Sequence, residues 1–246
     1  MSNLRSPLEK YSLDELRKKL EELDDLPTLP TVVQKVIRTA EDDKTGAQEL
    51  MKIVMNDQSL SAKIMRIANS AYYAQTNRIS SIDRAISTIG FNEVKNLAVA
   101  SIIARSFPSR SKIAHFSLEE FWVHSIAVAN ITKYFLKDET NEVQMMGFTA
   151  GLLHDIGKLI YCQFLPKHFF LIIHYVQSLK KEMYEVEEGV VGIHHGYAGK
   201  ILCDLWKLPE DYGKIVANHH LEIYGLSYAN ESDKLIVAVN LADTMA

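Results

Sequence analysis

The sequence predicts an all-α protein, on three observations. Only 11 glycines and 6 prolines occur in 246 residues, strand-like alternation of apolar and polar residues is scarce, and apolar residues recur at three- and four-residue spacing along nearly the whole chain. With 47% hydrophobic and 24% charged residues, the chain has the composition of a globular protein. It is long enough for one large domain or two packed subdomains.

The helices expected in the first half begin and end at recognisable signals. Ser12 followed by Glu15 is a capping-box pattern. Pro30 suits the first turn of a helix, and Asp57 stands where an N-cap belongs. Gly90 is expected to stop a short helix. The resulting helices cover about residues 13–24, 31–43, 46–57, 60–74, 81–89 and 92–105.

The second half is expected to follow a hinge at FPSRS, residues 107–111. Ser117, with Glu120 at the capping-box position, opens a long amphipathic helix to about residue 136. The glutamates of EVEEG are interpreted as a solvated face. Further helices are expected over about 142–156, 166–181, 195–206, 209–220 and 232–246. The last one has no cap or stop signal, so either the chain ends there or the sequence is a fragment of something longer.

Charge and cysteine content exclude some classes of protein. A formal net charge of -4 gives no global electrostatic reason to bind nucleic acid or an anionic membrane. Cys162 and Cys203 form no CxxC pair and are expected to be reduced core thiols. The N-terminus has no apolar core of signal-peptide type, and LAVASIIA at 97–104 is far shorter than the roughly 20 residues of a spanning helix. We expect a cytoplasmic protein.

Seven polar residues occupy positions at which the helical pattern of the second half requires buried or half-buried side chains. Any one of them alone would be interpreted as a hydrogen-bonded core residue, but together they predict a metal site. Imidazole and carboxylate are the ligands expected for zinc, iron, manganese or nickel, as one or two divalent ions. The seven are His124, His154, Asp155, His195, His219, His220 and Asp243.

The segment GLLHDIGKLI, residues 151–160, holds two of these residues side by side. Adjacent residues of a helix point about 100° apart, so His154 and Asp155 could hold one ion from two directions or two ions separately. His219 and His220 repeat that geometry. Glu120 lies four residues before His124, on the same helical face, where its carboxylate could ligate a metal or orient the imidazole.

The order of these residues resembles the HD superfamily of metal-dependent phosphohydrolases, and GLLHDIGK matches its most specific stretch. His195 and His219–His220 look like the additional ligands of the HD-GYP branch, which hydrolyses cyclic di-GMP at a two- or three-metal site. Residues 219–229, HHLEIYGLSYA, align without gaps with that branch's signature HHExxDGxGYP. The two histidines, Gly225 and Tyr228 match, whereas four residues differ: Leu221, Tyr224, Ser227 and Ala229.

The rest of the chain is similar to the HDOD family, the HD-related output domain. The similarity spans roughly residues 20–220 and is carried by LPTLPTVVQKV, NDQSLSAKIMRIANSAYY, SIDRAISTIGFNEVKNL, FWVHSIAVA and HHGYAGKILCDLWKLP. It implies an N-terminal helical subdomain packed on an HD-type helical bundle. The expected organisation is an N-terminal helix in 1–25, the N-terminal HDOD subdomain in 26–108 and the HD-like subdomain in 109–246.

Two functions are compatible with this resemblance. Many HDOD members belong to bacterial signalling proteins, lack parts of the metal site and act as regulatory modules, which predicts a signalling protein partner or a nucleotide ligand. The alternative is a metal-dependent phosphohydrolase or phosphodiesterase acting on a nucleotide or cyclic dinucleotide. Asp155 would then serve in catalysis, and Lys158 would donate to a substrate phosphate as the matching lysine does in the catalytic branch. Otherwise, Lys158 reaches past a helix C-terminus to solvent.

The N-terminal half contains two further candidate surfaces. Asn69, Ser70 and Tyr72–Tyr73 form either a recognition surface or, as we prefer, a C-capped helix end. Nucleic-acid binding would use the basic residues of this half, but the acidic net charge places it last. The candidate phosphate contacts are Lys63, Arg66, Arg78, Arg84 and Lys95.

Overall fold

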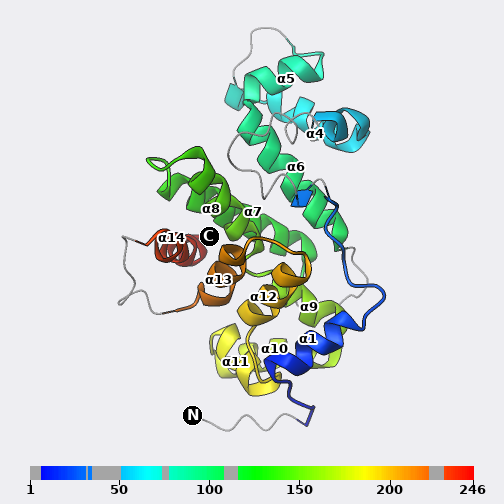
Figure 1. The fold of residues 1–246 in the computed structure, drawn as a ribbon, viewed down its shortest axis with the longest axis vertical. Coiled ribbons are helices and arrows are strands. Elements are labelled where there is room, and N and C mark those ends of the chain that lie inside the picture. The colour runs from blue at the N-terminus through cyan, green and yellow to red at the C-terminus, as the bar shows by residue number, and fades with distance from the viewer. Residues whose placement is uncertain (1–6, 32, 35–50, 74–77, 108–115, 222–229) are drawn as a thin grey trace. The chain divides into compact units, whose positions relative to one another are not determined.

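The computed structural model describes residues 7–31, 33–34, 51–73, 78–107, 116–221 and 230–246. Within these ranges every regular element is a helix, which confirms the all-α prediction (Figure 1). The chain divides into two compact units, one of residues 29–106 and one that combines residues 1–28 with 107–246. Among the described residues no single helix is long and apolar enough to cross a membrane; by length and composition alone, the bent pair Asn141–Phe164 and Pro166–Leu179 could.

In the described part of the unit of residues 29–106, three helices pack on one another, accompanied by a further helical segment and a short 3-10 turn. Residues 51–56 are helical, and the remaining elements are α4 (Gln58–Ala68), η1 (Ala71–Tyr73), α5 (Ile82–Ile89) and α6 (Phe91–Ser106). Asp57 is the N-cap of α4, since its carboxylate accepts the backbone N–H of Leu60 at 2.9 Å. The same carboxylate pairs with Arg105 near the end of α6. Most of the helix expected over 31–43 lies outside the described residues.

Asn69 closes the loop that follows α4. Its amide nitrogen donates to the carbonyls of Met65 and Ile79, at 2.9 and 3.0 Å, and its oxygen accepts the N–H of Ile79 at 2.8 Å. These bonds explain Asn69 as the C-cap of α4 rather than as a recognition residue. The side chain of Tyr72 lies outside the described part of the chain.

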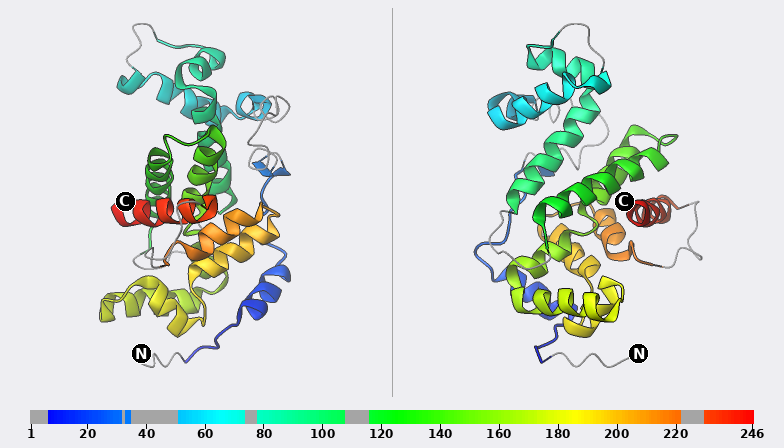
Figure 2. Two further views of the ribbon diagram at one scale, coloured as in Figure 1. Left: turned by 60° about the vertical axis from the view of Figure 1, so that its left-hand side comes forward. Right: turned by 180° about the vertical axis from the view of Figure 1, so that it is seen from behind.

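The other unit carries every predicted metal ligand. In it α7 packs on α8 and α14, α9 packs on α12, α12 packs on α13, and α10 packs on α11 (Figures 1 and 2). Its helices are α1 (Leu13–Glu21), α7 (Leu118–Phe135), α8 (Asn141–Leu153), α9 (Ile156–Phe164), α10 (Pro166–Leu179), α11 (Met183–Val190), α12 (His195–Leu205), α13 (Glu210–Asn218) and α14 (Glu231–Met245).

Helix α1 belongs to this unit and packs on α12. The predicted capping box is present, because Ser12 Oγ accepts the N–H of Glu15 and the Glu15 carboxylate accepts the N–H of Ser12 at 2.7 Å. Leu16 and Leu20 are buried on its inner face. After the helix, the indole of Trp206 donates to the carbonyl of Pro27 at 2.7 Å, so the chain that follows α1 is also hydrogen-bonded to this unit.

The helix expected over 142–156 ends three residues early, at Leu153, and a helix that was not expected, α9, follows it. α8 ends at Leu153 and α9 begins at Ile156, so His154 and Asp155 lie at the junction rather than within one helix. Helix α11, Met183–Val190, is a further difference from the prediction, which places the EVEEG glutamates on a solvated face. Glu187 of that stretch is fully buried. Both differences have a tertiary cause, the packing of these segments around the histidine cluster described below.

The two glycines of GLLHDIGK permit close helix packing around this junction. A Cβ on Gly157 would lie 1.9 Å from the backbone oxygen of His195 and 2.8 Å from the backbone nitrogen of Gly199. A Cβ on Gly151 would lie 2.9 Å from the Cα of Ala129 in α7. Real Cβ atoms do not approach backbone atoms this closely, so α9 can meet α12, and α8 can meet α7, only with glycine at these positions.

Candidate metal centre

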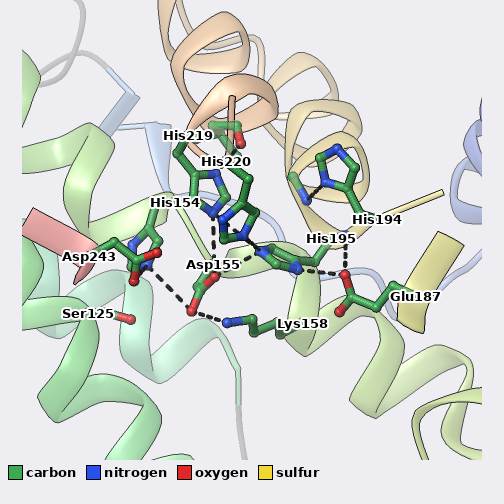
Figure 3. A network of polar contacts seen from close by, with 12 residues as sticks. Ser125, His154, Asp155, Lys158, Glu187, His194, His195, His219, His220 and Asp243 are labelled. Atoms are coloured by element: carbon green, nitrogen blue, oxygen red, sulfur yellow. Dashed lines mark hydrogen bonds and ion pairs between the residues drawn. The ribbon is translucent and has the colours of Figure 1, made fainter. Parts of the chain in front are cut away.

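The structure brings seven of the predicted ligands into one cluster from different parts of the unit, and all of them except His124 are labelled in Figure 3. Helix α7 supplies His124, the α8–α9 junction supplies His154 and Asp155, and the start of α12 supplies His195. The end of α13 supplies His219 and His220, and the last turns of α14 supply Asp243. Five of these residues, all except His124 and Asp243, stand within two residues of the first or last residue of a helix. At these positions their side chains can point toward the ends of the neighbouring helices.

One half of the cluster combines two imidazoles with two carboxylates. Oδ1 of Asp243 lies 3.0 Å from Nε2 of His124 and 3.3 Å from Nε2 of His154. Oδ2 of Asp155 lies 3.4 Å from Nε2 of His154 and 3.9 Å from Nε2 of His124. These four atoms surround what we call the first ion position.

The other half combines three imidazoles with the second oxygen of the same aspartate. Oδ1 of Asp155 lies 3.0 Å from Nε2 of His195 and 3.8 Å from Nε2 of His219. Nε2 of His195 is 3.3 Å from Nε2 of His219 and 3.0 Å from Nε2 of His220. These atoms surround the second ion position, and Asp155 presents one oxygen to each half.

Three of the imidazoles are held in a fixed orientation through their other ring nitrogen. When Nδ1 carries the hydrogen and donates it, the lone pair of Nε2 is left free for a metal, and the ring cannot rotate away. The acceptors are the carbonyl of Gly151 for His154 at 2.7 Å, the carbonyl of Val216 for His219 at 2.7 Å, and the carboxylate of Glu187 for His195 at 2.6 Å.

The donor atoms of the cluster fit a divalent cation. Nε2 of His154 and Oδ1 of Asp155 are buried and, among the described residues, make no well-formed hydrogen bond, although carboxylate oxygens lie 3.3 and 3.4 Å from the first atom and His195 Nε2 lies 3.0 Å from the second. Buried polar atoms without partners are costly and rare in folded proteins. The Nε2 atoms of His195, His219 and His220 also converge on one another, so their lone pairs repel unless a cation or a proton lies between them. Nitrogen and carboxylate ligands in this number suit zinc, iron, manganese or nickel.

Without a cation, protons compensate part of the negative charge. Burial alone lowers the pKa of His154, but the carboxylates of Asp155 and Asp243 outweigh it and raise the pKa to about 9. Burial raises the pKa of Asp155, but His154 and Lys158 hold it well below its usual range. Burial and the nearby imidazole of His195 lower the pKa of His220 to about 3. The imidazole of His154 is therefore charged at neutral pH, and that of His220 is neutral.

Lys158 points directly into the first half of the cluster. Its ammonium lies 2.5 Å from Oδ2 of Asp155, and its side chain is 19% exposed (Figure 3). The residue lies in the first turn of α9, so the alternative of a lysine reaching past a helix C-terminus is wrong. Its contact with a substrate phosphate stays a prediction.

Glu120 is not brought to the cluster. It lies in the exposed first turn of α7, where its backbone N–H donates to Ser117 Oγ at 3.2 Å, and the converging ligand atoms of the described residues do not include it. Residues four apart share a helical face but are separated by about 6 Å along it. His124 reaches the cluster, whereas Glu120, one helical turn earlier on the same face, lies beyond the edge of the cluster. The assignment of Glu120 as a metal ligand is therefore corrected.

Glu187 is the residue that the sequence interpretation missed. Its Oε2 accepts both the backbone N–H and the Nδ1–H of His195, at 2.7 and 2.6 Å. A signal was present in the sequence, because Glu187 stands four residues after Met183 and three before Val190, on the apolar side of its helix. Of the stretch aligned with the HD-GYP signature, residues 222–229 lie outside the described residues.

The fold and the cluster together define an all-helical protein with an HD-type arrangement of histidine and aspartate. The chain matches the HDOD domain over residues 26–222 and belongs to the HDOD family. None of the curated proteins is a significant match.

Solved structures with the same fold come from several bacteria. An HDOD domain protein of unknown function from Geobacter sulfurreducens is 27% identical, with a TM-score of 0.80 over 95% of this chain and 76% of that one. A Shewanella amazonensis protein provisionally called a phosphohydrolase is 24% identical, with a TM-score of 0.69 over 92% of this chain and 79% of that one. A Marinobacter aquaeolei protein provisionally called a signal transduction protein is 23% identical, with a TM-score of 0.70 over 95% and 51%. The last two likenesses concern the fold alone.

Proposed function

We propose that this chain is a regulatory module of the HDOD type whose HD-like site binds two divalent metal ions. The observation that carries the proposal is the position of Asp155, whose two oxygens face two separate groups of imidazole nitrogens. Three of those imidazoles have Nδ1 already committed to an acceptor, so their Nε2 atoms are prepared for a metal. Membership of the HDOD family supports the regulatory assignment.

A bacterial, cytoplasmic signalling context with a protein partner or a nucleotide ligand is part of this proposal. The family assignment and the bacterial structures with the same fold support it. Binding of nucleic acid or of a membrane surface is not proposed, because the net charge of -4 provides no attraction to either.

Metal content provides the direct test. The purified protein is expected to hold up to two ions of zinc, iron, manganese or nickel per chain by elemental analysis. Asp243→Ala should lose the ion of the first position, His219→Ala the ion of the second, and Asp155→Ala both. A protein that takes up no stoichiometric metal after incubation with each ion would contradict the proposal.

A second candidate is a metal-dependent phosphohydrolase, which the partial exposure of the first half favours. His124 and Asp243 are 32% and 22% exposed, so a phosphate could reach this edge of the cluster. Two bound ions would lower the pKa of a shared water and stabilise charge on an attacked phosphate. Asp155 would hold both positions at a fixed separation, and the Lys158 ammonium would donate to a phosphate oxygen.

Turnover separates this candidate from the regulatory module. The metal-loaded protein would be incubated with nucleoside phosphates and with cyclic dinucleotides, and phosphate or linear product measured. Hydrolysis that disappears in Asp155→Asn and falls at least 100-fold in Lys158→Ala would support the enzyme. No turnover of either substrate class by a fully loaded protein would leave the regulatory module as the function.

A further inference from the structure

The helix α11 lies beside the second half of the metal centre without contributing a ligand to it. Two of its residues, Tyr184 and Glu187, are three apart and therefore share a helical face. Each contacts a different ligand of the second ion position. The ligands of the first position come from α7, the α8–α9 junction and α14, so apart from Asp155, which faces both positions, the two halves of the centre draw on different helices.

Glu187 contacts His195 in a way that fixes both its backbone and its ring. The carboxylate is fully buried, and one oxygen accepts the backbone N–H and the ring Nδ1–H of His195. Nε2 of the same ring then faces Asp155 Oδ1 at 3.0 Å (Figure 3). A carboxylate in this place fixes the tautomer, restrains the ring and makes the ligand nitrogen more basic. Burying a carboxylate costs free energy unless hydrogen bonds compensate for the lost water, and here the two hydrogen bonds from His195 do so.

Tyr184 contacts His220 through its ring face. The two ring centroids are 4.7 Å apart and the planes differ by 24°, a stacked arrangement. Nε2 of His220 lies 3.0 Å from Nε2 of His195, so the stack covers one face of a ligand at the second ion position.

We propose that Glu187 and Tyr184 of α11 are positioning residues for His195 and His220, and that α11 thereby governs occupancy of the second ion position while leaving the first unaffected. The inference rests on the proposed metal function. It assigns to α11 a role separate from that of the ligands, since neither residue is placed to touch an ion of the first position.

The test compares variants of the full chain by stepwise zinc titration, with the two binding steps resolved by calorimetry. Glu187→Leu, which removes the acceptor, is expected to weaken binding at the second ion position 10- to 100-fold. Binding at the first ion position should change by less than threefold. Glu187→Gln keeps an acceptor oxygen and should lie between the wild type and Glu187→Leu. Tyr184→Leu should weaken binding at the second ion position about tenfold. Tyr184→Phe keeps the aromatic ring and should bind there as the wild type does. The matched control is Glu188→Gln, an exposed residue of the same helix.

A readout in the metal-free protein separates this inference from the proposed function. The ring Nδ1–H of His195, donated to a buried carboxylate, should give a downfield-shifted proton resonance in protein labelled with ¹⁵N-histidine. That resonance should disappear or move upfield in Glu187→Leu. If the wild type binds no metal, the proposed function fails and this resonance alone decides the role of Glu187. Equal weakening of both steps, no weakening, or an unchanged resonance would overturn the inference.

Discussion

The backbone of Gly157 in α9 lies against the backbone carbonyl of His195 at the start of α12. No side chain fits between them, because a Cβ on Gly157 would lie 1.9 Å from that oxygen. This contact brings Asp155, two residues before the glycine, within 3.0 Å of the His195 ring. The glycine of the HDIGK stretch therefore determines a distance inside the metal centre.

Replacement of Gly157 by alanine should disrupt both stability and metal binding. We expect Gly157→Ala to lower the free energy of unfolding by about 3 kcal/mol, because backbone must move to relieve the overlap. Urea denaturation measures this change. Gly213→Ala in α13 is the matched control, since its nearest contact is a flexible lysine side chain at 3.2 Å, and it should change stability by less than about 1 kcal/mol. Equal effects of the two substitutions would contradict the expectation.

Binding of the first ion should release a proton at neutral pH. The pKa of His154 is raised to about 9 in the metal-free protein, so an ion at the first position must displace its proton at pH 7. We expect Mn²⁺ affinity to rise about tenfold per pH unit between pH 7 and 8.5. Calorimetry in buffers of different ionisation enthalpy measures the released proton directly. Affinity that is constant over this range would show that His154 is already neutral.

The same histidine should make the metal-free protein less stable at alkaline pH. Its folded-state pKa, about 9, lies above the ordinary histidine value of 6.5. The stabilisation is therefore fully present below pH 6.5 and is lost as the pH rises through 9. A shift of this size corresponds to about 3 kcal/mol. Urea denaturation in the presence of a chelator, at pH 6 to 9, should show this decline in the wild type, and His154→Gln should lack it.

Lys158 should compete with a metal for Asp155. Its ammonium lies 2.5 Å from Oδ2, the oxygen that faces the first ion position. Lys158→Met removes a positive charge from this position and should raise the affinity for the first ion about tenfold. Lys234→Met is the matched control, because that lysine is also paired, with Glu139 at 2.6 Å, and should leave the affinity unchanged. A lower affinity in Lys158→Met would mean that Lys158 supports the site instead.

Helix α1 should contribute to the stability of the unit that holds the metal centre. Leu16 is fully buried, and its truncation in Leu16→Ala should lower the free energy of unfolding by about 3 kcal/mol through the cavity that it leaves. Lys18→Ala, on the exposed face of the same helix, should have an effect below about 0.5 kcal/mol. Thermal and urea denaturation of the two variants provide the comparison. An equally small effect of Leu16→Ala would show that α1 folds independently of the rest.

The fold class and the seven residues of the cluster followed from the sequence because they depend on local pattern. Apolar spacing predicts helices directly, and several polar residues at inward positions indicate a site without any coordinates. The break in the helix between Leu153 and Ile156 could not be predicted from the sequence. The residues on both sides of the junction are apolar and continue a helical pattern, and the break accompanies the packing of α9 against α12. Glu187 was missed for a related reason. A glutamate among other glutamates looks solvated until the imidazole that faces it is known.

The region of family similarity and the folded unit have different limits. The HDOD match covers residues 26–222, yet α1 packs on α12 from before the first of these residues, and Asp243 on α14 comes after the last. A fragment cut at the limits of the match would expose the surface that Leu16 and Leu20 cover and would remove one carboxylate of the first ion position. Such a fragment could hold the second ion while failing to hold the first, and its metal content would then misreport the capacity of the intact chain.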